Sequence, residues 1–235
     1  MGLTGAVIVA AGKGTRMKAD INKQYIKIGG KPIVYHTIEG FLQSEHIDEV
    51  VAVIVKEEED LFNDIVRPLL KDTKKLKIAY GGAMRKDSVQ NGIGKLSKGC
   101  ETVLIHDGVR PFFKDEDIKA VIDKTVEYDG AISGVPVKDT IKRINAQGMI
   151  EDTVDRKMLF AAAPPQAFKK DRLITAYKAY EESDAAGEAT DDAYIMELIG
   201  AEVITVPCSY NNIKITTPED IIFAESILKS KRENE

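Results

Sequence analysis

The sequence predicts a single α/β domain of Rossmann-like type, in which a mostly parallel sheet lies between two layers of helices and a β-hairpin arm projects from it. Short apolar runs rich in β-branched residues alternate with segments of helical periodicity, as in a parallel sheet with helices on both faces. The alternation is interrupted over Asp139–Val154, where two short β-like runs flank a turn. A chain of 235 residues suits one compact domain. We therefore expect residues 1–235 to form one domain, with residues 138–157 as the arm.

Seven apolar runs have the length and composition of strands. They lie at Gly5–Ala10, Val50–Val55, Lys77–Tyr80, Thr102–His106, Ala131–Val137, Glu202–Val206 and Ile213–Thr216. Because parallel α/β sheets bind ligands beyond the carboxyl ends of their strands, the loops after Ala10, Tyr80 and His106 form the expected ligand site.

The segments between these runs place apolar residues three and four positions apart, as on one face of a helix. Helices are predicted from Pro32 through Leu42, over Glu57–Leu70, around Val89–Leu96, over Asp115–Tyr128 and Lys169–Glu182, from about Asp191, and from Pro218. Thr217 is predicted to cap the last helix, with Pro218 at its first position and Asp220 three residues past the cap.

The predicted arm consists of Thr140–Ile144 and Met149–Val154 on either side of the turn Asn145–Gly148. An isolated two-stranded ribbon is marginally stable in water, so the arm should pack against another surface. We expect that surface to belong to a second copy of the chain, in a homodimer.

The bulk composition argues against several classes of protein. Hydrophobic residues make up 43% and charged residues 30% of the chain, which is ordinary for a folded globular protein. The net charge of -5 disfavours a nucleic-acid binder. No apolar run approaches the roughly 20 residues that span a bilayer, and no signal peptide is recognisable. With only two cysteines, Cys100 and Cys208, we expect a reduced protein of the cytoplasm without membrane contact.

The loop after the first strand, Ala10–Met17, has the composition of a phosphate-binding turn. Glycines directly after a strand allow backbone N–H groups to approach phosphate oxygens. A dinucleotide-binding fingerprint would need a third glycine where Met17 stands, and the spacing of a Walker A loop is absent. Instead the loop places Arg16 beside the glycines and Lys23 seven residues later. Fixed cations at these positions suit a triphosphate whose charge shifts during a reaction.

This loop and the Lys-Gln-Tyr sequence at 23–25 resemble the opening of the sugar-phosphate nucleotidyltransferases. Further motifs follow in order at 81–89 (GGAMRKDSV), 106–111 (HDGVRP), 137–143 (VKDTIKR), 153–156 (TVDR), 165–166 (PQ), 190–193 (TDDA) and 212–216 (NIKIT). Together, from about Gly5 to about Leu228, they resemble the 2-C-methyl-D-erythritol 4-phosphate cytidylyltransferases of the non-mevalonate isoprenoid pathway.

The resemblance implies a reaction and a set of site residues. The family joins CTP to 2-C-methyl-D-erythritol 4-phosphate and forms 4-diphosphocytidyl-2-C-methyl-D-erythritol and pyrophosphate. Its catalytic residues fall on Arg16, Lys23, Arg156 and Lys214. Its nucleotide-binding residues fall on Ala11, Gly12, Gly14, Gly81, Gly82, Ala83, Ser88 and Asp107. Its acceptor-binding residues fall on Asp107, Arg110, Thr140, Arg156, Thr190, Asp191 and Lys214.

The resemblance also implies a metal ion and a shared site. Asp107 follows a predicted strand, where its carboxylate can hold Mg²⁺ or another divalent cation. In the family the arm crosses to the partner subunit, where the arginine matching Arg156 binds the acceptor's phosphate, which suits its planar guanidinium. His106 has no evident acid or base partner in the sequence, and we expect it to be structural.

Two positions depart from the family's pattern. Pro164 replaces a threonine, and Pro207-Cys208 stands where a glycine is common. The first departure removes a hydroxyl group and a backbone N–H, and so affects any acceptor contact made there.

Two other functions remain open. One is cytidylyl transfer to ribitol 5-phosphate or another polyol phosphate, although the Ala-Ala-Gly of the loop and Thr153–Arg156 favour methylerythritol phosphate. The other is a non-catalytic nucleotide-binding regulator, which would not need the cations Arg16, Lys23 and Lys214.

Overall fold

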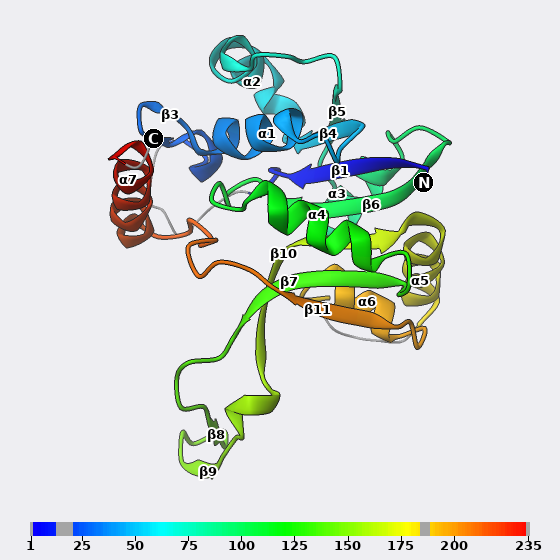
Figure 1. Ribbon diagram of the computed structural model, residues 1–235, viewed down its shortest axis with the longest axis vertical. Coiled ribbons are helices and arrows are strands. Elements are labelled where there is room, and N and C mark those ends of the chain that lie inside the picture. The colour runs from blue at the N-terminus through cyan, green and yellow to red at the C-terminus, as the bar shows by residue number, and fades with distance from the viewer. Residues whose placement is uncertain (1, 13–20, 184–188, 234–235) are drawn as a thin grey trace.

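A seven-stranded sheet forms the centre of the computed structural model, which describes residues 2–12, 21–183 and 189–233 (Figure 1). Its order is β11-β7-β10-β6-β1-β4-β5. The strands are β1 (Leu3–Val9), β4 (Glu49–Ile54), β5 (Leu76–Tyr80), β6 (Cys100–Asp107), β7 (Gly130–Pro136), β10 (Phe160–Lys169) and β11 (Val203–Pro207). Neighbouring strands are parallel except that β10 runs antiparallel to both β6 and β7. The prediction of a mostly parallel sheet is confirmed.

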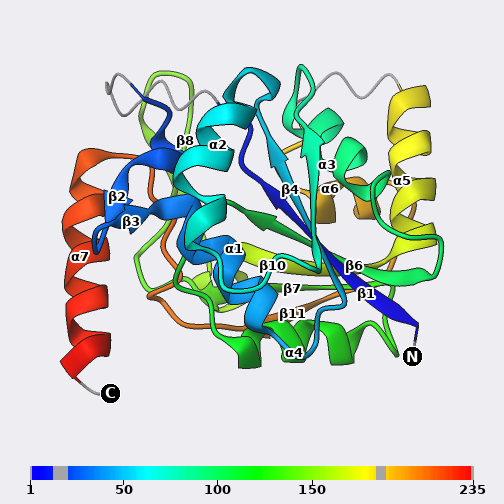
Figure 2. The same ribbon diagram turned by 90° about the horizontal axis from the view of Figure 1, so that it is seen from above.

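Helices cover both faces of the sheet, which confirms the three layers (Figure 2). One face packs against α1 (Ile33–Gln43), α2 (Glu59–Ile65) and α4 (Asp115–Lys124). The other face packs against α3 (Arg85–Ile93), α5 (Lys170–Glu182) and α6 (Asp192–Glu197). The alternation of side chains along β1 supplies both cores, because Ala6 and Ile8 point to the first face and Val7 to the second.

The last helix, α7 (Pro218–Glu233), lies beside the short hairpin of β2 (Lys27–Ile28) and β3 (Lys31–Pro32). A third apolar cluster joins it to that hairpin and to Val109 and Ile215. Asp220, three residues past the predicted cap Thr217, accepts through Oδ2 hydrogen bonds from the backbone N–H groups of Thr216 at 2.8 Å and Thr217 at 2.9 Å.

The predicted strand Ile213–Thr216 is wrong. This segment has no regular secondary structure, and its Ile215 N–H donates to the Val109 carbonyl, in the loop after β6, at 2.9 Å. Conversely, β10 was not expected, because Pro164 and Pro165 lie in its middle and proline cannot donate to a ladder. The register of β10 against β7 shifts between Ala163 and Gln166, so the two prolines lie where the ladder is interrupted.

Two predicted helices are shorter than their apolar patterns. The segment predicted over Glu57–Leu70 divides into the 3-10 turn η3 (Lys56–Glu58), α2, and the 3-10 turn η4 (Arg67–Leu69), whose Pro68 cannot continue an α-helix. Likewise α4 ends at Lys124, four residues before the predicted end at Tyr128.

The arm is present and extends away from the body of the molecule between β7 and β10 (Figure 1). Its two strands, β8 (Lys142–Ile144) and β9 (Ile150–Thr153), pair antiparallel and form a sheet of their own. The turn is held by Asn145, whose Oδ1 accepts from the N–H groups of Gln147 and Met149 at 3.0 Å each. No helix in the described ranges is long and apolar enough to cross a membrane.

The central strand β1 provides a test of this core. Replacing the fully buried Ile8 with alanine should lower the free energy of unfolding by about 2–5 kcal/mol, because the neighbouring side chains can only partly fill the space. The matched control is Ile222→Ala on the outer face of α7, where the side chain is 72% exposed and the change should stay within about 0.5 kcal/mol. Urea unfolding followed by circular dichroism measures both; equal effects would contradict the assignment of Ile8 to the core.

Candidate active site

A cavity of about 430 Å³ lies where β1 and β6 end, beside the turn that follows β5. In the ladder between β1 and β6, Val9 pairs with Asp107, so the ends of both strands reach the same edge of the sheet. The described residues that line the cavity are Val9, Ala10, Ala11, Gly12, Lys23, Gln24, Gly82, Ala83, Met84, Arg85, Ser88, Asp107, Val109 and Lys214. The site therefore lies at the strand ends where the sequence predicted it.

The turn after β5 brings backbone close to the loop after β1. A Cβ atom on Gly81 would lie 2.3 Å from the Cβ of Ala11, so only glycine permits this approach. The next N–H group, of Gly82, donates to Ser88 Oγ at 3.1 Å, and Ser88 Oγ donates to the Met84 carbonyl at 3.2 Å. These bonds fix the turn against the start of α3 and leave its edge facing the cavity.

Asp107 lies at the end of β6 among three cations. Its Oδ2 atom is 3.0 Å from Lys214 Nζ and 3.3 Å from Arg110 Nε. Burial raises the pKa of the Asp107 carboxyl, but the positive charges of Lys214 and Arg85 outweigh burial and lower that pKa to about 2. Asp107 is therefore ionised at neutral pH.

The segment 212–215 brings Lys214 to this carboxylate. Arg110 donates through Nη1 to the Asn212 carbonyl at 2.8 Å, and the Ile215 N–H bonds to the loop after β6. Lys214 thus reaches the cavity from a segment without regular secondary structure, although the sequence predicted a strand there.

His106 is structural, as expected. Its ring is fully buried and packs edge-on against Phe41 and Phe113, with centroid distances of 5.0 and 4.8 Å. Its Nε2 atom lies 3.0 Å from the Arg110 carbonyl oxygen, and burial lowers the pKa of the imidazole to about 4. The ring is therefore neutral at pH 7 and lies on the opposite side of β6 from Asp107.

Most of the predicted nucleotide-binding residues meet in this cavity. Ala11, Gly12, Lys23, Gly82, Ala83, Ser88, Asp107 and Lys214 line it, and Gly81 forms the turn beside it. Arg110 adjoins it through its ion pair with Asp107. Gly14 and Arg16 lie outside the described residues.

The predicted acceptor-binding residues other than Asp107, Arg110 and Lys214 are dispersed. Thr190 lines a neighbouring cavity of about 240 Å³. Asp191 caps α6 by accepting from the Tyr194 N–H at 2.9 Å, and its second carboxylate oxygen accepts from Gln166 Nε2 at 2.9 Å. Thr140 and Arg156 are exposed on the arm and do not line the cavity of their own chain. Within one chain the structure therefore does not assemble the predicted acceptor site.

Arg85 is a cavity residue to which the sequence interpretation gave no role. It lines both cavities, and its Nη2 atom lies 2.8 Å from Oδ2 of Asp192, which is fully buried. Arg85 follows the pair Gly81-Gly82 by three residues, which repeats the association of glycines with a cation at 12–16, and this signal was available in the sequence.

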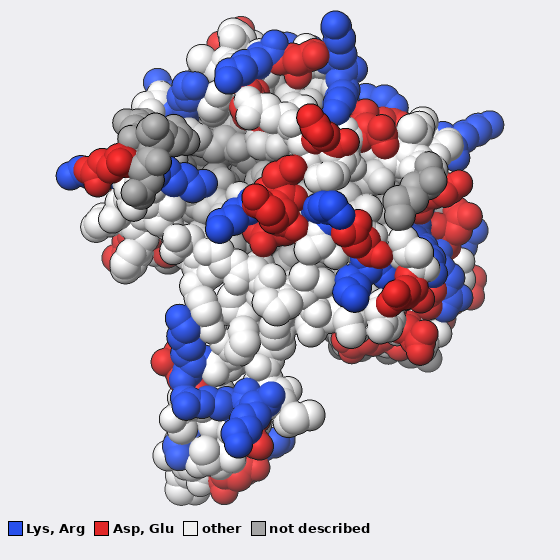
Figure 3. Space-filling model, in the orientation of Figure 1, with Lys and Arg blue, Asp and Glu red and all other residues white. Residues whose placement is uncertain are grey.

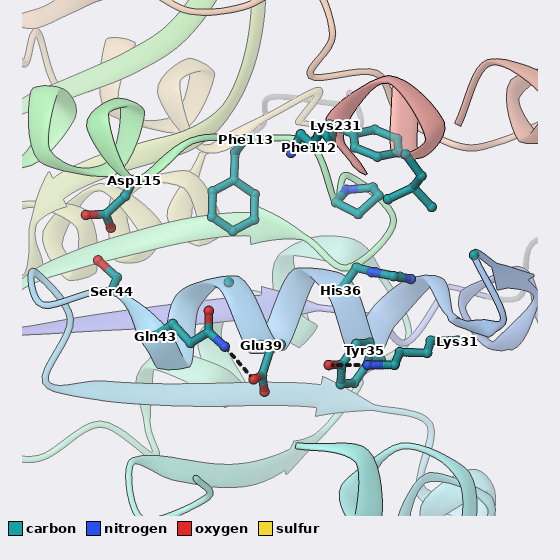
Figure 4. Close-up of a pocket in the computed structure, with 14 residues that line it drawn as sticks. Lys31, Tyr35, His36, Glu39, Gln43, Ser44, Phe112, Phe113, Asp115 and Lys231 are labelled. Carbon is teal, nitrogen blue, oxygen red and sulfur yellow. Dashed lines mark hydrogen bonds between the residues drawn. The ribbon is translucent and has the colours of Figure 1, made fainter. Parts of the chain in front are cut away.

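A larger cavity, of about 720 Å³, lies between α1, the segment 111–115 and α7 (Figure 4). None of the described residues that line it also lines the first cavity. Its carboxylates have local partners: Glu39 accepts from Gln43 Nε2 at 2.6 Å, and Asp115 lies 3.4 Å from His46. Gly29, in the turn between β2 and β3, lines this cavity, but none of its described lining residues belongs to a strand of the central sheet. We therefore assign the active site to the smaller cavity, which lies at the ends of β1 and β6.

Comparison with known proteins shows the family to which the chain is similar. The sequence model of the 2-C-methyl-D-erythritol 4-phosphate cytidylyltransferase family matches residues 4–230. A protein of that name from Clostridioides difficile (strain 630) is 46% identical over 97% of this chain and 95% of its own length. One from Alkaliphilus oremlandii (strain OhILAs) is 43% identical over 98% of this chain and 97% of its own.

Solved structures give the same result. The 4-diphosphocytidyl-2C-methyl-D-erythritol synthase of Anaerococcus prevotii DSM 20548 has a TM-score of 0.85 and 34% identity, and the match covers 97% of this chain and 96% of that one. The Francisella tularensis 2-C-methyl-D-erythritol 4-phosphate cytidylyltransferase has a TM-score of 0.79 and 27% identity, covering 95% and 99%. The resemblance drawn from the motifs is thus confirmed: the chain belongs to the 2-C-methyl-D-erythritol 4-phosphate cytidylyltransferase family.

Proposed function

We propose that this protein transfers a cytidylyl group from CTP to 2-C-methyl-D-erythritol 4-phosphate in isoprenoid biosynthesis. An oxygen of the acceptor's phosphate attacks the α-phosphorus of CTP, a new P–O bond forms, and the bond to the β-phosphate breaks with release of pyrophosphate. The observation that carries the proposal is the meeting of Lys23, Lys214 and Asp107 beside two glycine turns, in a chain that the family matches over nearly its whole length.

The chemistry requires charge neutralisation more than proton transfer. The second pKa of a phosphate monoester is about 6, so the acceptor is already a nucleophilic anion at neutral pH. What limits the reaction is negative charge that accumulates on the transferring phosphoryl group and on pyrophosphate. Lys23 and Lys214 line the cavity and supply fixed positive charge, and we assign the same role to Arg16 by its place in the family's motif.

The nucleotide is assigned to the glycine turns. A volume of about 430 Å³ is in the range of small-molecule sites. The N–H groups of Gly81 and Gly82 already donate to Ile54 and Ser88, so their carbonyl oxygens are the groups that can accept a hydrogen bond from the amino group of cytosine. The Ser88 oxygen lines the same cavity.

We propose Asp107 as the protein ligand of Mg²⁺, with other divalent cations as alternatives. Among the described residues that line the cavity, Asp107 is the one carboxylate, and no cluster of three or more metal-binding side chains occurs in the described ranges. This donor set fits Mg²⁺, which is commonly bound by one or two carboxylates and the substrate's phosphates. When bound, the ion would neutralise charge on the departing pyrophosphate.

We further propose a homodimer in which each arm completes the acceptor site of the partner. Lys and Arg side chains gather on the arm (Figure 3), among them the exposed Arg143 and Arg156. The arm also exposes large apolar side chains to solvent, which favours burial against another surface. They are Ile144 at 58%, Met149 at 63%, Ile150 at 64% and Met158 at 85% exposure.

Both cysteines are free thiols, which suits the cytoplasmic location that we also propose.

An acceptor screen tests the proposed reaction. Purified protein with CTP and Mg²⁺ should release pyrophosphate with 2-C-methyl-D-erythritol 4-phosphate and much less with ribitol 5-phosphate. The assay is coupled detection of pyrophosphate, and chelation of Mg²⁺ with EDTA should abolish it. Release with ribitol 5-phosphate alone would move the assignment to that acceptor, and release with neither would favour a nucleotide-binding regulator.

Substitution of Lys23 tests the role of fixed charge. Lys23→Ala should lower kcat by about 10²–10³, because one preorganised transition-state contact is lost, with a much smaller change in the Kd for CTP. Lys27→Ala is the matched control, since this lysine is exposed on β2. Turnover and CTP binding are measured separately, by pyrophosphate release and calorimetry. A loss confined to CTP affinity would make Lys23 a binding residue only.

Mixing two inactive variants tests the shared site. Arg156→Ala removes a residue that we place in the partner's site, whereas Lys23→Ala damages the subunit's own site. Each variant alone should be inactive. Exchange of subunits should restore about a quarter of wild-type activity, since about half of the dimers are mixed and each contains one complete site. No recovery despite proven subunit exchange would contradict exchange of the arms.

A further inference from the structure

Two buried side chains outside the cavity hold Arg85 in place. Oδ2 of Asp192, at the start of α6, lies 2.8 Å from Arg85 Nη2. Its other oxygen, Oδ1, accepts a hydrogen bond of 2.5 Å from the hydroxyl of Tyr177 on α5. Asp192 is fully buried and Tyr177 is 2% exposed, and neither is among the described residues that line the nucleotide cavity. Tyr177, Asp192 and Arg85 thus form a hydrogen-bonded network that runs from the core beneath α3, α5 and α6 to the edge of the cavity.

This network is restrained because leaving any of its buried polar groups unpaired would cost free energy. A carboxylate removed from water must be compensated by opposite charge and hydrogen bonds, and Asp192 receives both, one on each oxygen. Burial and the neighbouring Asp192 charge raise the pKa of Tyr177, so its hydroxyl keeps its proton and donates. Asp192 therefore stays in place between its two partners.

Arg85 connects this buried network to the turn 81–88, which faces the proposed nucleotide site. It is the first residue of α3, and the same helix start holds the turn through two further bonds. The Met84 N–H donates to Asp87 Oδ2 at 2.9 Å, and the Gly82 N–H donates to Ser88 Oγ at 3.1 Å. Fixing the guanidinium of Arg85 therefore also restrains the backbone of 81–88, whose atoms line the cavity.

We propose that Tyr177 and Asp192 are positioning residues for the nucleotide: they hold Arg85 and, through it, the turn 81–88 in the arrangement that binds CTP. The proposal rests on the proposed function for the identity of the nucleotide. Asp192 also directly follows Thr190 and Asp191, so the same ion pair joins the segment assigned to the acceptor to the segment assigned to the base. The Arg85–Asp192 ion pair therefore links the proposed nucleotide site to the proposed acceptor site.

The affinity for CTP, measured by calorimetry without the acceptor, tests the proposal. Asp192→Asn should raise the Kd about tenfold or more, and Tyr177→Phe about three- to tenfold, because hydrogen bonds to charged groups are lost. Arg85→Ala should have an effect at least as large. In the Arg85→Ala protein, adding Tyr177→Phe should weaken CTP binding no further, because Tyr177 acts through Arg85.

The control is Tyr35→Phe on α1, which also removes one hydrogen-bonded hydroxyl group, one that accepts from Lys31 Nζ at 2.9 Å, but which lies outside the nucleotide cavity. Its Kd for CTP should equal that of the wild type. Thermal unfolding of every variant separates lost stability from lost positioning. The proposal is overturned if Tyr177→Phe and Asp192→Asn leave the Kd unchanged, or if Tyr177→Phe weakens binding equally with and without Arg85.

Product formation separates this proposal from the proposed function. A protein that makes no product from 2-C-methyl-D-erythritol 4-phosphate, yet loses CTP affinity in the expected pattern, would keep the positioning role and lose the acceptor assignment. A protein that makes the product while Tyr177→Phe and Asp192→Asn bind CTP normally would keep the function and lose the positioning role.

Discussion

Asp107 lies at the end of β6, where its carboxylate accepts contacts from Lys214 and Arg110 through one oxygen, Oδ2. Arg110 lies three residues after Asp107, whereas Lys214 comes from a distant segment of the chain, and Arg110 also donates to the carbonyl of Asn212, 102 residues later. This carboxylate therefore holds Lys214, and through Arg110 it also supports the segment 212–215, which has no ladder of its own. The same segment is held by the bond from the Ile215 N–H to the Val109 carbonyl and by the bond from Asn212 Nδ2 to the Pro164 carbonyl at 2.7 Å.

Cations outnumber carboxylates among the described residues that line the cavity. The described lining residues include three cations, Lys23, Arg85 and Lys214, and the carboxylate of Asp107, while Asp192 pairs with Arg85 from outside the cavity. These cations lie close together in a protein whose net charge is -5. A polyphosphate is therefore attracted to the cavity in particular, while Asp107 prevents the lysine and arginine side chains from repelling one another before a ligand arrives.

The sequence was sufficient for the local features and insufficient for those that depend on long-range contacts. Buried parallel strands are continuous apolar runs, so β1, β4 and β6 could be located directly. In β10 the prolines hid a central strand, because the interruption of the ladder that accommodates them is a property of the pairing with β7. The Ile213–Thr216 run has the composition of a strand, but no neighbouring strand was available to it, and composition cannot reveal this.

The site was predictable to a similar extent. Residues that belong to motifs next to strand ends, such as Lys23, Ser88 and Asp107, lie in one cavity as expected. Asp192 was quoted within a motif without a role of its own, and Tyr177 gave no signal beyond its apolar ring at a helical position. Their contact with Arg85 spans 107 residues between Arg85 and Asp192, and only the packing of α3, α5 and α6 brings the three together.

The reversed direction of β10 has a consequence for where the arm leaves the molecule. Because β7 runs parallel to β6, it ends at the same edge of the sheet as β6, and an antiparallel β10 begins at that edge, with Phe160 opposite Pro136. A strand parallel to β7 would have to start at the opposite edge of the sheet, so a crossover connection would have to bring the polypeptide back there. An insertion in that connection could then leave the molecule at either edge of the sheet. The single inverted strand therefore lets the arm leave and rejoin the sheet at one edge, and this is the edge at which β6 ends and to which we assign the active site.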